Sequence, residues 1–426
     1  MLRKTVLDNG IRVVTEHISH ARTVSVGIWV DVGARDEHDL TNGCSHFVEH
    51  MLFKGTPTRS AGQIAMELDV LGGTANAFTG KDATCYYATV LDTQLPRLLD
   101  LFADFFLNSF FDPEEVEREK QVIQQEISMV EDTPEEQIHD LFEGLLWGHH
   151  PLGNTILGSL EVVSRMDRQK LLDHMRNFYT PGQVVFAAAG NLDHENFCGR
   201  LNALFSSLHK SEALFRGERK MPQELPVVQK VFSKPLEQAH VALGTYGLDV
   251  SSPDRYKLMI LNIILGGNMS SRLFQEIREK RGLAYSVHSY LDSYQDSGYL
   301  GVYLGVNPAN VNHSLQVIRA ELCKLCHEPV SAIELSNARD YARAGLFLAA
   351  ENMEMRMTRL ARNELYFGRD VSYDEVLREF DLVTAEDVCR LAGRLFSKGM
   401  TTAVLAPLSA ADVDLHFPAG FTLQAV

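Results

Sequence analysis

The sequence predicts two copies of one α+β domain joined by a linker. In the first half, short segments rich in β-branched and aromatic residues alternate with longer segments of helical periodicity. Near residues 208–226 this alternation gives way to a stretch of basic residues and prolines, which is typical of an interdomain linker. The alternation then restarts, and a chain of 426 residues is long enough for two or three domains.

The elements of the first half follow from local patterns. Asn9 and Gly10 form a turn dipeptide between two apolar runs, so the chain is expected to begin with a hairpin. Strands are expected where β-branched, aromatic or small apolar residues run together, at 23–30, 84–90 and 184–190. Helical spacing predicts helices over 43–53, 62–71, 95–106 and 113–130. The last of these has the clearest start, with Asp112 as N-cap and Pro113 at the first helical position.

The second half repeats this plan. Residues 241–246 resemble the strand at 26–30, and the apolar segment 256–265 resembles the helix at 43–53. Long helices are expected to follow, over 311–326 and 333–351. The predicted organisation is therefore an N-terminal domain over 1–208, a linker over 209–229 and a C-terminal domain over 230–426.

Charge and composition exclude several classes of protein. The formal net charge is −16, from 40 Lys and Arg against 56 Asp and Glu, which disfavours nucleic acid as a partner and favours basic peptides. No apolar run approaches the roughly 20 residues that span a bilayer, and no signal peptide is expected. Six scattered cysteines do not suggest a disulfide framework, so the prediction is a reducing, cytoplasmic location.

One short motif indicates metal chemistry. His46 and His50, in the pattern HxxEH, lie one turn apart on the same face of the predicted helix, so both imidazoles can reach one metal ion. Glu49 lies beside them, where a carboxylate can take a proton from an attacking water. This order of residues is the inverted zincin signature.

The motif needs a third protein ligand, because catalytic zinc sites usually have three. The predicted helix over 113–130 offers Glu119 and Glu126, which are two turns apart on one face. Either carboxylate is a candidate on this reasoning, and a solvated helix face is the alternative explanation for both.

A longer segment around the motif resembles a known family. Residues 43–56, GCSHFVEHMLFKGT, are similar to the active-site segment of the pitrilysin/insulysin superfamily of metallopeptidases. Within it, the nearest likeness is to the mitochondrial processing peptidase β-subunit and its bacterial relatives. The resemblance extends over nearly the whole chain. It implies two homologous domains, each a largely antiparallel sheet flanked by helices, as in the processing peptidases.

The resemblance also implies roles for individual residues. His46, His50 and Glu126 match the family's zinc ligands, with one zinc ion per chain, and Glu49 matches its general base. Glu119 matches a second glutamate that supports the ligands, and a ligating histidine does need a partner on its other ring nitrogen.

Three further segments match family signatures. Asn76, Ala77 and Phe78 match the edge strand on which family members bind extended peptides by β-augmentation. Arg278 and Tyr285 match a pair that contacts substrate near the scissile bond, where a tyrosine can donate to the developing oxyanion. The second half has no HxxEH, so the resemblance implies an inactive copy kept for substrate binding.

One finer match concerns specificity. Glu136 and Asp140 match two acidic residues with which processing peptidases hold an arginine near the cleavage site. Carboxylates at i and i+4 suit a guanidinium group, although a solvated acidic helix face is the alternative.

The expected function is a zinc-dependent endopeptidase acting on peptides or unfolded, presequence-like segments, with a preference for basic residues near the cut. A non-catalytic scaffold of the same fold is the alternative, and a metal-storage protein would need neither Glu49 nor the pair Arg278 and Tyr285. The resemblance further implies a homodimer, or a heterodimer with a related subunit, whose two chains enclose a chamber. A mitochondrial matrix location is the alternative to the cytoplasm if the chain is a mature form.

Overall fold

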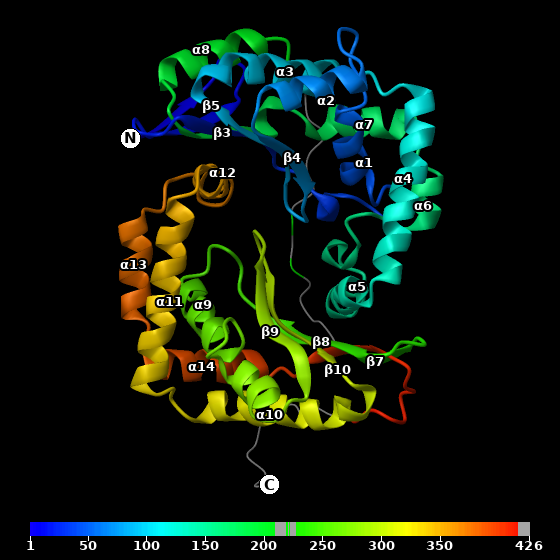
Figure 1. Cartoon of the computed structure of the whole chain (residues 1–426), viewed down its shortest axis with the longest axis vertical. Helices are drawn as coiled ribbons and strands as arrows, with labels where there is room; N and C mark the ends of the chain where they lie inside the picture. The colour runs from blue at the N-terminus through cyan, green and yellow to red at the C-terminus, as the bar shows by residue number, and fades with distance from the viewer. Residues whose placement is uncertain (209–218, 220, 222–226, 416–426) are drawn as a thin grey trace. The chain divides into compact units, whose positions relative to one another are not determined.

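The computed structural model describes the chain except residues 209–218, 220, 222–226 and 416–426. The chain forms two compact units, each built on one β-sheet (Figure 1). The first unit comprises Met1–Met129, Asn154–Glu218 and Leu348–Asp370. The second comprises Val130–Gly153, Arg219–Phe347 and Val371–Val426. Neither unit is therefore continuous in the sequence.

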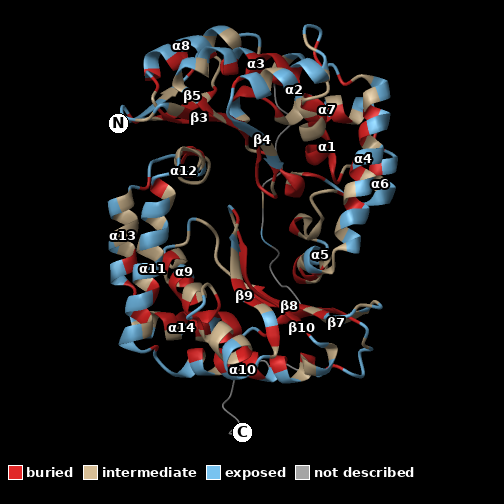
Figure 2. Cartoon of the chain, in the orientation of Figure 1, coloured by how far each residue is buried: buried red, intermediate tan, exposed pale blue. Residues whose placement is uncertain are grey.

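The first unit has a six-stranded sheet in the order β1-β2-β6-β3-β5-β4. Its strands are β1 (Leu2–Val6), β2 (Arg12–His17), β3 (Thr23–Val30), β4 (Thr74–Thr79), β5 (Thr84–Leu91) and β6 (Val184–Gly190). All neighbours pair antiparallel except β2 and β6, which are parallel. The central strands β3 and β6 are buried over nearly their whole length because both faces of the sheet are covered, as Figure 2 shows for β3.

Most helices of the first unit cover one face of this sheet. They are α1 (Cys44–Leu52), α2 (Ala61–Val70), α3 (Leu95–Asn108), α4 (Pro113–Asp132), α6 (Leu160–Ser164), α7 (Arg168–Phe178) and α8 (His194–Leu204). Their apolar side chains form one continuous core with those of the strands, and Phe47, Phe102 and Phe186 are among its largest members. This core holds α1 against the sheet.

Among its described residues, the second unit repeats the topology with one strand fewer. Its strands are β7 (Gln229–Ser233), β8 (Ala239–Tyr246), β9 (Ala284–Ser293), β10 (Gly298–Val306) and β11 (Thr401–Ala406), in the order β7-β11-β8-β10-β9. The parallel pair β7 and β11 corresponds to β2 and β6, and the remaining pairs are antiparallel as in the first unit. The predicted repeat of one α+β domain is thereby confirmed as a repeat of sheet topology.

Helices cover both faces of the second sheet as well. The larger core lies on the side of α9 (Arg255–Leu265), α10 (Val311–His327), α11 (Ala332–Ala350), α13 (Tyr373–Leu382) and α14 (Ala385–Phe396). The other face packs against α5 (Pro134–Trp147), where Phe142 and Trp147 meet Tyr299 and Tyr303.

Each half of the sequence contributes one helix to the sheet formed by the other half. The helix α5 comes from the first half but packs on β8 and β11 of the second sheet, and α12 (Met353–Phe367) comes from the second half but packs on β3 and β6 of the first. In the first unit, Trp29 donates a hydrogen bond to the sulfur of Met357 on α12, at 3.2 Å. Each sheet thus buries one apolar face under a helix distant in sequence.

The structure confirms the expected hairpin, strands and helices to within a few residues at their ends. Asp112 accepts hydrogen bonds from the backbone of Glu114 and Glu115, as expected of an N-cap. Most of the predicted linker, 209–229, lies outside the described residues. Within the part of the chain that the structure describes, no helix combines the length and apolar character needed to cross a membrane.

Candidate metal centre

The helix α1 places the HxxEH residues along one side. Its apolar residues, among them Phe47 and Val48, are fully buried in the core of the first unit. His46 and His50 lie one turn apart, and the centroids of their rings are 4.5 Å apart. The amphipathic spacing of α1 therefore keeps both imidazoles on the same side of the helix.

Glu126 comes to the two histidines from α4. Ile123 and Ile127 on this helix are buried, and they pack α4 against the core that also holds α1. The Oε2 atom of Glu126 lies 3.7 Å from Nε2 of His46 and 3.7 Å from Nε2 of His50. One ligand atom from each of the three residues falls within 4.8 Å of the others.

The arrangement fits a zinc ion. Ligand atoms at 2.0–2.2 Å in a tetrahedral site lie roughly 3.3–3.6 Å apart. The 3.7 Å between Oε2 of Glu126 and Nε2 of each histidine is close to this separation. The Oε2 atom of Glu126 is buried and has no hydrogen-bond partner among the residues that the structure describes, so its position is explained better by a cation than by a polar contact. Two imidazoles and one carboxylate are also a common ligand set of catalytic zinc.

Glu119 contacts His50 and forms an ion pair with Lys54. Its side chain is only 3% exposed, its Oε1 is 3.5 Å from Nδ1 of His50, and Nζ of Lys54 forms an ion pair with its other oxygen. Burial raises the pKa of Glu119, but the combined effect of His50 and Lys54 in lowering it is larger, so the net shift is downward. The contact between the ionised Glu119 and Nδ1 of His50 fixes the orientation of the imidazole ring. The other ring nitrogen of His50, Nε2, then points away from Glu119.

The two histidines differ in proton affinity. Burial, with a smaller effect of His50, lowers the pKa of His46 to about 3, so this imidazole is neutral at physiological pH. Burial also lowers the pKa of His50, but the carboxylates of Glu119, Glu126 and Glu49 raise it more. A cation bound between the rings would favour the neutral form of both, because metal ligation requires an unprotonated nitrogen.

Glu49 is half-buried beside this centre. Burial raises the pKa of its carboxyl, and a hydrogen bond from the Thr79 hydroxyl opposes part of that shift. Thr79 is the last residue of β4, so the strand contacts the glutamate directly. A carboxylate with a raised pKa is well suited to accept a proton at neutral pH.

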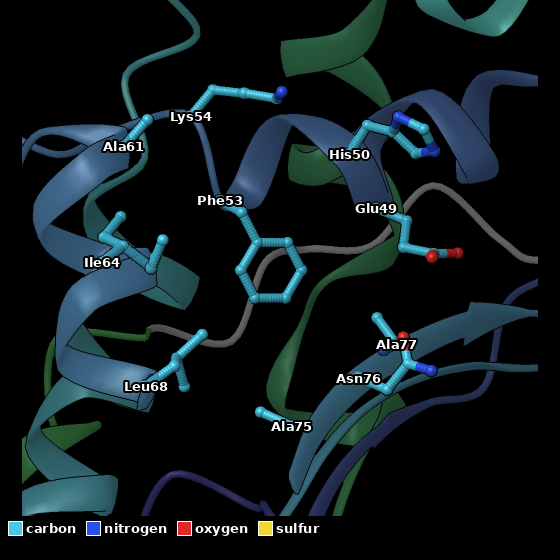
Figure 3. Close-up of a pocket in the computed structure, with 11 residues that line it drawn as sticks. Glu49, His50, Phe53, Lys54, Ala61, Ile64, Leu68, Ala75, Asn76 and Ala77 are labelled. Atoms are coloured by element: carbon cyan, nitrogen blue, oxygen red, sulfur yellow. Dashed lines mark hydrogen bonds between the residues drawn. The ribbon is translucent and has the colours of Figure 1, made fainter. Parts of the chain in front are cut away.

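A pocket of about 400 Å³ opens next to Glu49 and His50. Figure 3 shows Phe53 after the end of α1, and Ile64 and Leu68 on α2, pointing into the same space. The opposite wall is β4, with Ala75, Asn76 and Ala77, and Lys54 lines the pocket as well. The pocket is therefore mainly apolar and bordered by the candidate catalytic carboxylate.

The strand β4, which carries Asn76, Ala77 and Phe78, is the edge strand of its sheet. Among the described residues it pairs with β5 alone, so its other side offers backbone groups to an additional strand. Phe78 is 41% exposed, and its ring contacts Trp29 edge-on at 5.4 Å between centroids.

The structure places Arg278 and Tyr285 in the second unit and brings them together there. The guanidinium carbon of Arg278 lies 4.6 Å from the centroid of the Tyr285 ring, a cation–π contact. Tyr285 is 81% exposed on β9, the edge strand of the second sheet. The sequence predicted both residues but not their mutual contact.

Glu136 and Asp140 also belong to the second unit. Both lie on α5, at i and i+4 in its first half, where Glu136 is exposed and Asp140 partly buried. The expected spacing of one helical turn is thus present, and their role in substrate binding stays a prediction.

Comparison with known proteins decides the family. The model of the insulinase family, peptidase family M16, matches residues 12–160, and the model of the peptidase M16 inactive domain matches residues 165–341. The protein of Bacillus subtilis called uncharacterized zinc protease YmxG is 39% identical, over 96% of this chain and 98% of its own length. The chain belongs to peptidase family M16.

Solved structures share the M16 fold. A protease from Helicobacter pylori superposes with a TM-score of 0.91 at 24% identity, over 96% of this chain and 99% of the other. A chain of complex III2 from Candida albicans superposes with a TM-score of 0.82 at 20% identity, covering 96% of each. The family models and the relative from Bacillus subtilis confirm the resemblance seen in residues 43–56 and the expectation of a peptidase.

Sequence reasoning missed several contacts of this M16 site. The partners of Glu49 and Glu119 are Thr79 and Lys54, neither of which had been singled out for that role. The wall formed by α2 was also missed, because its apolar residues resemble those of any amphipathic helix. The sequence did carry a signal that Glu119 is buried, because Glu119 occupies a position in the otherwise apolar stripe of α4.

Proposed function

We propose that the chain is a zinc-dependent endopeptidase whose single zinc ion is held by His46, His50 and Glu126. The observation that carries the proposal is the convergence of three ligand atoms from two helices beside a half-buried Glu49. Relatives that match over nearly the full length bear the name zinc protease, which supports the same assignment.

The chain's own groups supply the remaining chemistry. When bound, zinc acts as a Lewis acid toward water and the scissile carbonyl. Glu49 accepts a proton from the attacking water and then delivers it to the leaving amine. Glu119 keeps His50 oriented, and Thr79 keeps the Glu49 carboxylate directed by its hydrogen bond.

The edge strand and the pocket indicate the form of the substrate. An extended peptide that pairs with β4 through its main chain would pass beside Glu49 with little demand on sequence. Alternate side chains of such a strand point to the same face, so one of them can enter the apolar pocket between α2 and β4. Most backbone groups of a folded protein are already paired, so the proposed substrates are peptides and unfolded segments.

A preference for basic residues near the cut is part of the proposal. Glu136 and Asp140 would hold a guanidinium group, and the net charge of −16 favours basic peptides generally. A map of cleavage sites in a peptide library tests this preference. Replacing Glu136 and Asp140 by Gln and Asn should remove any basic bias and spare neutral substrates, whereas an unbiased map for the wild type would contradict it.

We further propose a dimer that encloses a chamber, either a homodimer or a heterodimer with a related subunit. The M16 inactive domain supports a binding role for the second half of the chain. In this arrangement Arg278 and Tyr285 of one subunit would serve the metal centre of the other, with the tyrosine donating to the developing oxyanion. The scarcity and scatter of cysteines support a cytoplasmic location.

The decisive experiment measures zinc content and peptidase activity on the same purified protein. About one zinc ion per chain, with hydrolysis of unstructured peptides that a chelator abolishes and zinc restores, is the expected result. Stoichiometric zinc without hydrolysis of a broad peptide library would contradict the peptidase and favour a metal-binding role alone.

A non-catalytic scaffold is the second candidate. The chain shares its fold with a chain of complex III2, and a fold by itself is compatible with a structural role. The convergence of His46, His50 and Glu126 beside Glu49 favours the peptidase, since a scaffold requires none of these groups.

A further inference from the structure

The carboxylate of Glu37 is buried at the N-terminal end of α1. Glu37 is 5% exposed and follows the short 3₁₀ helix Ala34–Asp36. Its Oε1 accepts a hydrogen bond from the backbone N–H of Ser45 at 2.5 Å, and its Oε2 accepts one from Gly43 at 2.7 Å. The Nδ2 group of Asn42 donates a third hydrogen bond to Oε2, at 3.2 Å.

These contacts replace a side-chain cap that α1 lacks. The N-cap position is Gly43, which has no side chain to accept from the amides of the first turn. The partial positive charge at a helix N-terminus also favours a carboxylate there. Glu37 is buried, so it lies in dry surroundings where each hydrogen bond is strong. This burial raises its pKa to about 7, and the hydrogen bonds from Ser45, Gly43 and Asn42 oppose part of the rise.

The start of α1 has little room to move sideways. Gly43 has a φ of 92°, and a Cβ atom at this position would lie 2.6 Å from the carbonyl oxygen of Leu157. Two residues after Gly43, the Ser45 hydroxyl lies 3.3 Å from Nε2 of the buried His174 on α7. Ser45 immediately precedes His46, so the anchored turn leads directly into the candidate ligands.

We infer that Glu37 is a positioning residue of the metal centre. By holding the amides of Gly43 and Ser45, it sets the rotation and axial position of α1, and hence where His46 and His50 face Glu126. The inference rests on the proposed metal site. Without the anchor, the first turn of α1 loses two hydrogen bonds and His46 is the first ligand to be displaced.

The test compares helix caps inside and outside the site. Glu37→Gln keeps the size of the side chain and one acceptor, whereas Glu37→Ala removes both acceptors. Asp193→Ala is the matched control, because Asp193 caps α8 by accepting from the backbone of Asn196 at 2.8 Å and α8 carries no candidate ligand. For each variant, zinc affinity is measured by chelator competition, geometry by the absorption of bound cobalt(II), and stability by the Tm.

We expect zinc affinity to fall by at least about tenfold in Glu37→Ala, and by less in Glu37→Gln, with altered cobalt bands. Asp193→Ala should lower the Tm and leave affinity and bands unchanged. If the Glu37 variants lower the Tm but bind zinc within about twofold of wild type, Glu37 is a structural cap and the inference is overturned.

Two safeguards keep the result interpretable. If Glu37→Ala does not fold, the near-isosteric Glu37→Gln decides the question by the same measurements. Wild-type protein is measured alongside, and a failure of wild type to bind zinc would overturn the proposed function and this inference with it. Wild-type binding together with unchanged Glu37→Gln binding would overturn the inference alone.

Discussion

The Thr79 hydroxyl donates a hydrogen bond to the carboxylate of Glu49. Thr79 ends β4, the edge strand, and Glu49 lies on α1 between the two candidate histidine ligands. The contact therefore joins the strand proposed to bind substrate to the proposed general base. We therefore expect occupation of the strand to affect the orientation of Glu49 through the Thr79 side chain.

Removal of this hydrogen bond should impair turnover more than binding. Thr79→Val keeps the shape of the side chain but leaves Glu49 without its donor, and we expect kcat to fall by about tenfold with KM nearly unchanged. Steady-state kinetics on an unstructured peptide measure both constants. Thr74→Val is the control, because Thr74 is exposed at the other end of the same strand. Equal effects of the two substitutions would contradict a specific role of Thr79.

The base itself should be indispensable for turnover but not for metal binding. Glu49→Gln preserves the size of the side chain and cannot accept the proton, so turnover should fall by at least about 100-fold while zinc is retained. Glu114→Gln, at an exposed position of α4, is the control. Near-normal hydrolysis by Glu49→Gln, measured with zinc content on the same sample, would exclude the proposed mechanism.

The third ligand can be identified by zinc content. Glu126→Ala should lose most of its zinc, because two histidines alone hold the ion weakly. Glu119→Gln should keep zinc with an affinity lowered by about 10- to 100-fold, the usual effect of losing a partner of a ligating histidine. Elemental analysis after dialysis distinguishes the two. If Glu126→Ala kept a full complement of zinc and Glu119→Gln lost it, Glu119 would be the third zinc ligand and Glu126 would not.

The buried His174 should contribute an acid-sensitive component to the stability of the fold. Burial lowers the pKa of this histidine to about 3, whereas an unfolded chain titrates near 6.5. Below about pH 6.5 the unfolded state therefore binds a proton at this residue that the folded state does not, so the contribution of His174 to stability falls by about 1.4 kcal/mol per pH unit towards pH 3. Urea unfolding at several pH values measures the slope. His174→Gln should flatten it, and the exposed His20→Gln should not.

Mixing two inactive variants tests whether the proposed dimer shares its sites. Glu49→Gln and Tyr285→Phe each lack one required group, so each alone should be inactive. If Tyr285 serves the partner's metal centre, mixed dimers contain one site with both groups intact and activity should partly return. Subunit exchange is followed by mass spectrometry. Exchange without recovery would place the action of Tyr285 within its own chain, or deny it a role.

Much of this fold is encoded locally and could be predicted. The Asn9-Gly10 turn, the Asp112 cap and the alternating apolar runs each depend on neighbouring residues, so they specify strands and helices without tertiary information. The HxxEH spacing likewise places His46 and His50 together by helical geometry alone. The sequence left Glu119 and Glu126 equivalent as third ligand until the family resemblance separated them.

Contacts between distant segments were decided only by tertiary structure. That α5 covers the second sheet and α12 the first follows from which apolar faces meet, and amphipathicity shows that a face is buried without showing its partner. The same holds for Thr79 beside Glu49 and for Lys54 beside Glu119. The sequence alone therefore determined the helices and strands and the metal-binding motif. The packing of helices onto sheets determined which polar groups surround that motif, because burial and hydrogen bonding depend on the assembled core.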